Sequence, residues 1–68
     1  MSDWSMLSGA NLIYCARFWD NEFKKKFPRA VLLLTQGDED LGYDDLYWAM
    51  FALRARRSFT DEIARRHA

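Results

Sequence analysis

The chain has a single cysteine, Cys15, and a single histidine, His67, among its 68 residues. An internal disulfide is therefore impossible, and these two ligands do not support a structural zinc site, which normally takes four. Small domains without either device usually depend on self-association or on a very well packed helical core. We therefore expect one small domain over residues 1–68 that draws part of its stability from a partner chain.

Long apolar runs and an excess of charge are also missing. The longest apolar run is AVLLL at residues 30–34, far short of the roughly 18 residues that a membrane span needs. The start, MSDWSMLSG, lacks the basic and apolar regions of a signal peptide. Ten basic and ten acidic residues give a net charge of zero, which argues against bulk nucleic-acid binding. We expect a cytoplasmic protein that contacts no membrane.

The sequence carries no recognisable catalytic or metal-binding motif. His67 is next to last, where chains fray, and Cys15 lies among apolar residues at helical spacing. The acidic run that begins at Asp38 fails the EF-hand pattern, because its twelfth position is Ala49 instead of glutamate. There is no glycine-rich phosphate loop and no HExxH motif. We expect neither an enzyme nor a bound cofactor or metal.

Aromatic residues make up 16% of the chain, and half of all residues are hydrophobic. A first helix is expected over about 8–27, with Ser8 as its N-cap and Pro28 as its stop. Apolar residues recur along it at spacings of three and four. They are Leu12, Cys15, Ala16, Trp19, Phe23 and Phe27. A connector over 28–42 follows, and its apolar run is too short to separate a short helix from a strand.

A second helix, expected over about 43–66, is apolar on two sides. One side forms an ordinary core stripe of Leu46, Ala49, Met50, Leu53, Thr60 and Ala64. The opposite side consists of Trp48, Ala52, Ala55, Phe59 and Ile63, flanked by Phe51. The residues assigned to a dimer are Trp48, Phe51, Ala52, Phe59 and Ile63. A helix that is apolar on most of its circumference is normally covered on two sides. We expect an all-α helix-loop-helix protomer that forms a two-fold dimeric helical bundle through this second side. Alternatively, residues 28–36 fold back over it in a monomer.

Acidic residues concentrate before and within the start of the second helix. Asp38, Glu39, Asp40, Asp44 and Asp45 lie within a short segment that has no basic residue. A solvated loop and helix start would explain them. The functional alternative is a surface that docks on a basic, DNA-binding region of another protein, with tyrosines supplying rigid contact area. The residues of this acidic surface are Asp38, Glu39, Asp40, Tyr43, Asp44 and Tyr47.

Basic residues form two groups, one at the expected end of each helix. Lys24, Lys25, Lys26 and Arg29 end the first helix, and Arg54, Arg56, Arg57, Arg65 and Arg66 mark the second. Cations at helix C-termini complement the helix dipole, which explains both groups without a ligand. A small DNA-binding regulator that uses Arg54, Arg56 and Arg57 is the competing interpretation. A helix-turn-helix reader, however, needs a short turn and a polar recognition helix.

The connector FPRAVLLL, the acidic segment DEDLGYDDLY and the short helical layout resemble small phage proteins made early in infection, of the quorum-sensing anti-activator type. That resemblance implies a helical dimer that binds a LuxR-type transcription activator of the host and blocks its DNA binding. It also implies binding to a pilus-assembly ATPase. Anti-CRISPR proteins are similar in size and in their acidic patches. The acidic surface is the region that would match a DNA-competing site.

Overall fold

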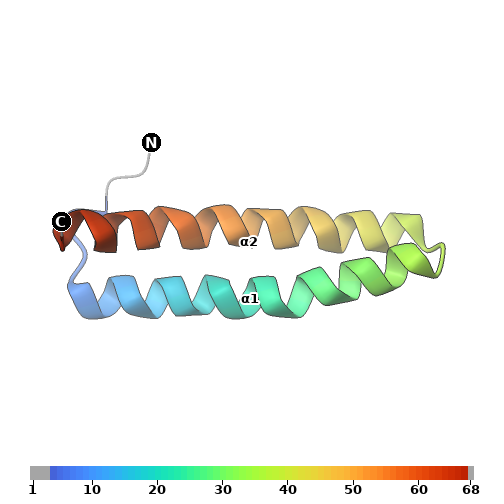
Figure 1. The fold of residues 1–68 in the computed structure, drawn as a ribbon, viewed down its shortest axis with the longest axis horizontal. Coiled ribbons are helices and arrows are strands. Elements are labelled where there is room, and N and C mark those ends of the chain that lie inside the picture. The colour runs from blue at the N-terminus through green and yellow to red at the C-terminus, as the bar shows by residue number, and fades with distance from the viewer. Residues whose placement is uncertain (1–3, 68) are drawn as a thin grey trace.

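The computed structural model describes residues 4–67, so the outermost residues of the domain expected over 1–68 lie outside the description. Two antiparallel helices, α1 (Gly9–Thr35) and α2 (Glu39–Arg66), lie side by side as a hairpin (Figure 1). Within residues 4–67 there is no strand, in agreement with the all-α prediction. The hairpin measures 44 × 20 × 17 Å and consists of a single layer of two helices.

The prediction that α1 stops at Pro28 is wrong, and so is the connector over 28–42. α1 continues through Pro28 to Thr35, and α2 begins at Glu39. An internal proline costs about 3 kcal/mol, because it cannot donate to the carbonyl four residues before it. Pro28 and Lys24 are both exposed, so water can reach that carbonyl, and Ala30 is fully buried just beyond. The packing of this last third of α1, which bends toward α2 in Figure 1, offsets the cost.

The other helix ends follow local sequence signals. Ser8 caps α1 as predicted, and its Oγ accepts a hydrogen bond from the Asn11 backbone N–H at 3.1 Å. α2 runs without interruption to Arg66, the predicted end.

A three-residue turn, 36–38, joins the helices. Gly37 has a φ of +87°, the left-handed conformation that glycine adopts without strain. The Asp38 N–H donates to the Leu33 carbonyl at 2.9 Å and the Gly37 N–H to the Leu34 carbonyl at 3.1 Å. This pair of bonds is the Schellman ending. Asp38 then caps α2 through its Oδ1, 3.4 Å from the Leu41 nitrogen. One residue therefore ends one helix and begins the next.

The interface between the helices, which we call the seam, is built mainly from small side chains. On α2 the buried residues recur at spacings of three, four and seven, the pattern of a helix that packs along its whole length. The buried residues of the seam are Leu12 and Ala30 on α1, and Gly42, Asp45, Ala49, Ala52 and Phe59 on α2. The predicted core stripe is therefore misplaced around α2. It contains Ala49, but Met50, Thr60 and Ala64 are exposed.

Gly42 marks the closest approach in the seam. A Cβ atom at this position would lie 2.7 Å from Leu34 Cγ and 3.1 Å from the Leu34 backbone nitrogen. Gly42 has ordinary helical geometry, so its value lies in the missing side chain and not in backbone freedom.

We expect Gly42→Ala to lower the thermal midpoint of unfolding. Overpacking costs about 1–3 kcal/mol, against about 1 kcal/mol gained in helix propensity. Gly9→Ala is the matched control, because a Cβ there meets nothing within 4 Å and should leave the midpoint unchanged or raised. Circular dichroism melts of the two variants provide the comparison. Equal midpoints would mean that Leu34 moves aside freely.

Candidate functional site

One side of the hairpin carries a continuous row of aromatic rings, which we call the aromatic face. Phe18 contacts Trp19 with centroids 5.2 Å apart, and Trp19 contacts Phe51 at 5.5 Å. Trp48 lies 5.6 Å from both Phe51 and Tyr47. All four contacts are edge-to-face, the geometry that the ring quadrupoles favour. The row fixes large apolar side chains in place while leaving much of their surface exposed.

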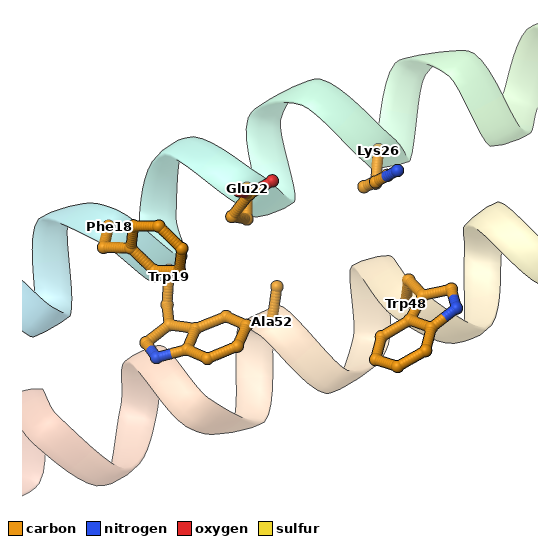
Figure 2. Close-up of a pocket in the computed structure, with 6 residues that line it drawn as sticks. All are labelled: Phe18, Trp19, Glu22, Lys26, Trp48 and Ala52. Atoms are coloured by element: carbon orange, nitrogen blue, oxygen red, sulfur yellow. The ribbon is translucent and has the colours of Figure 1, made fainter.

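A shallow pocket of about 230 Å³ opens between the helices on the aromatic face. Figure 2 shows its lining residues, with Phe18, Trp19, Glu22 and Lys26 coming from α1 and Trp48 and Ala52 from α2. The Trp19 and Trp48 indoles lie at its two ends, and the charged side chains lie along the α1 edge. A second pocket of about 470 Å³ continues past Phe51 toward Ala55 and Ser58.

The predicted dimer residues differ in how far the single chain exposes them. Trp48 is 47% exposed and Phe51 44%, so both are available to a second chain. Ala52 and Phe59 are only 1% and 7% exposed in the single chain. The expectation that these two need a second chain to cover them is wrong, because they belong to the seam. Ile63 is half-buried.

Phe59 is covered by a residue that sequence reasoning did not identify, Trp4. The two rings stack with centroids 4.5 Å apart, and Trp4 Nε1 donates to Ser58 Oγ at 2.6 Å. A tryptophan four residues before the N-cap Ser8, outside the helical apolar pattern, is the signal that could have suggested a docked segment. The rest of the segment cannot be inferred from periodicity, because it is not helical.

Arg66 holds the same segment against α2, in addition to the dipole role expected for it. Its Nη2 donates to the carbonyl oxygens of Trp4, Ser5 and Leu7 at 3.0, 3.1 and 2.7 Å. Glu62 accepts from Arg65 and, at 2.9 Å, from Arg66 Nε. These bonds, first that from Arg65 and then that from Arg66, lower the pKa of Glu62 from its usual 4.5 to about 2.

The acidic surface lies on the first turns of α2 instead of on a loop. Glu39 and Asp40 occupy the first turn, where carboxylates favour the positive end of the helix dipole, and Asp38 is the cap. All six residues of the surface are exposed. Tyr43 and Tyr47, one turn apart, line a hollow of about 320 Å³. The sequence-based residue set therefore forms one solvent-facing surface.

Asp45, unlike the neighbouring acidic residues, does not belong to the exposed acidic surface. Its carboxylate is buried, and Oδ2 lies 3.0 Å from Arg29 Nε. The geometry at Oδ2 does not satisfy a hydrogen bond, so the pair is held by charge and proximity. The inference that the acidic run has no compensating base is wrong for this residue, because the base comes from the adjacent helix.

The basic residues do not form one cluster. Residues 24–26 and Arg29 lie within α1, whose last turn has no basic residue, so the expected dipole role is wrong for all four. Arg56 pairs with Asp20 at 2.7 Å and lies over the Phe23 ring, while Lys24 pairs with the same carboxylate at 2.8 Å. The bonds from Lys24 and then Arg56 lower the pKa of Asp20. Arg56 and Arg54 line different pockets.

Within residues 4–67, no group of three His, Cys, Asp or Glu side chains could hold a metal ion. None of the helices in this range combines the length and apolar character that a membrane crossing requires. Comparison with known proteins finds no matching family, no matching curated protein and no matching solved structure.

The ion pairs of Glu62 with Arg65 and Arg66 predict that the stability of the fold decreases at low pH. Because the folded pKa is depressed, the carboxylate contributes stability above about pH 4.5 and loses it as the pH falls toward 2. Glu62→Gln should therefore melt below wild type at pH 7, and the gap should shrink between pH 4.5 and 2. Asp61→Asn, an exposed neighbour 4.0 Å from Arg57, should change the melt little. A gap for Glu62→Gln that stays constant with pH would contradict the assignment.

Proposed function

We propose that this protein is a non-enzymatic inhibitor that acts as a homodimer, binds a basic, DNA-binding surface of another protein and excludes DNA from it. The observation that carries the proposal is the exposed surface of Asp38, Glu39, Asp40, Tyr43, Asp44 and Tyr47 at the start of α2. Carboxylates pair with the arginines and lysines that normally contact phosphates, and tyrosines are frequent energetic centres of interfaces.

The helical setting of this surface supports the proposal. Asp40 and Asp44 are one turn apart, as are Tyr43 and Tyr47, so four side chains share one side of α2. A helix holds them in fixed positions before binding, which lowers the entropy lost on association. Net negative charge concentrated at one end of a neutral chain also favours approach to a basic partner.

The resemblance to phage anti-activators suggests the particular target. On that basis we propose a LuxR-type quorum-sensing activator in the host bacterial cytoplasm, with a pilus-assembly ATPase as a second partner. Binding to the activator's DNA-binding region would block its access to promoters.

The test is a competition assay with the purified DNA-binding domain of a LuxR-type activator and its promoter duplex. We expect Asp40→Lys/Asp44→Lys to raise the concentration needed to displace half of the DNA by about tenfold or more. The loss of one charge pair worth about 1.4 kcal/mol already weakens binding about tenfold. Asp38 is left unchanged in this variant because it caps α2.

Asp61→Lys is the matched control, because it reverses an exposed carboxylate far along α2 from this surface. It should inhibit like wild type. Full inhibition by the double variant would contradict the proposal. Direct, steeply salt-dependent binding of the wild-type chain to duplex DNA, lost on Arg54→Glu/Arg57→Glu, would instead support the DNA-binding alternative.

A further inference from the structure

We propose that the second copy docks on the aromatic face around a two-fold axis that runs across the helices, so that Glu22 of each copy pairs with Lys26 of the other. This inference deepens the homodimer of the proposed function by assigning its face, its direction and a reciprocal ion pair. The acidic surface and its partner are not needed for it.

The single-layer architecture is the reason to expect a second copy. Within residues 4–67 each helix packs against only one other helix, and the buried apolar residues are Leu12, Ala30, Ala49, Ala52 and Phe59. Stable domains normally contain at least two packed layers. A long face of a hairpin measuring 44 × 20 × 17 Å also matches the roughly 800 Å² that each partner buries in a standard interface. Face-to-face packing of two hairpins supplies the missing layer.

The aromatic face is the better candidate of the two long faces. Phe18, Trp48 and Phe51 are large, exposed and locked by ring contacts, so they lose little entropy on docking. The opposite side also has exposed apolar residues, but the Lys24–Asp20–Arg56 ion pairs interrupt it. Burying that charged group would cost desolvation free energy.

Charge complementarity then fixes the direction of the second copy. Glu22 and Lys26 are one turn apart on α1 and both border the pocket (Figure 2). Within residues 4–67, neither has an ion-pair partner closer than 4 Å. In a two-fold interface each contact occurs twice, once in each direction. An axis midway between Glu22 and Lys26 reverses the second α1, so that each carboxylate meets the other copy's ammonium group.

The same two-fold axis also gives Trp48, at one end of the pocket, a contact with the second copy. In Figure 2, Lys26 lies level with Trp48, and Glu22 lies level with Ala52. Reversal of the second hairpin therefore brings each Trp48 indole over the opposite copy's pocket, beside its Ala52. Phe51, one residue from Ala52, lies near the axis and meets its own counterpart. Ion pairs at the edge and aromatic packing at the centre give the usual arrangement of an interface.

The experiment uses Glu22→Lys and Lys26→Glu, each measured alone and as an equal mixture by sedimentation velocity over a range of concentrations. Wild type should sediment as a dimer of the 8.1 kDa chain. Each single variant faces like charges twice across the axis and should dimerise at least about tenfold more weakly. The mixture should recover wild-type affinity, because a chain with two lysines then meets a chain with two glutamates. Glu22→Lys/Lys26→Glu in one chain should recover it too.

Lys25→Glu is the matched control, since it makes the same charge change at the adjacent, exposed position and should leave the dimer intact. Circular dichroism verifies that every variant remains helical, and Trp48→Ala provides an uncharged variant that should also weaken the dimer. Single variants that dimerise like wild type, or a mixture that stays monomeric, would overturn the proposal. A wild-type monomer would overturn it as well. DNA displacement by the same variants reports separately on the acidic surface.

Discussion

The narrow seam between two helices is the constraint on which the rest of this structure depends. Gly42, Ala49 and Ala52 let the helix axes come close, and a single methyl group at Gly42 would already collide with Leu34. A seam made of small residues has no room for the rings of Phe18, Trp19, Trp48 and Phe51. They therefore lie along the flanks, half covered by each other. The aromatic face thus follows directly from how the hairpin closes.

Different contacts close the two ends of the hairpin. At the turn, Gly37 and Asp38 end α1 and start α2 within three residues, which places the acidic surface on helix from its first residue onward. At the other end, Trp4 and Arg66 cover the place where the seam would otherwise open. Between them, the buried Asp45 beside Arg29 favours one register of α2 against α1, since any slip would bury the charge without its partner.

Much of the fold can be predicted from sequence, because local signals control it. The helical class, the Ser8 cap and the end of α2 all come from capping and periodicity. The continuation of α1 through Pro28 cannot be predicted locally, because packing further along the helix outweighs the local cost of the proline. The position of the seam on α2 cannot be read from hydrophobicity, because the seam includes Gly42 and the charged Asp45, whereas the larger apolar residues lie beside it. Adjacent acidic residues can be read from the sequence, but the burial of Asp45 beside Arg29 cannot, because the two residues are far apart along the chain.

The contact between Trp4 and Arg66 places both ends of the described chain at the same end of the hairpin. A mechanical load applied through the ends would therefore pull the helices apart from that end instead of sliding them past each other. The Trp4 and Arg66 contacts would break first, and the seam would then open turn by turn toward Gly37. In this geometry the interhelical contacts bear the load one after another instead of all at once, so a small force should unfold the hairpin. The turn at 36–38 would be the last part to separate.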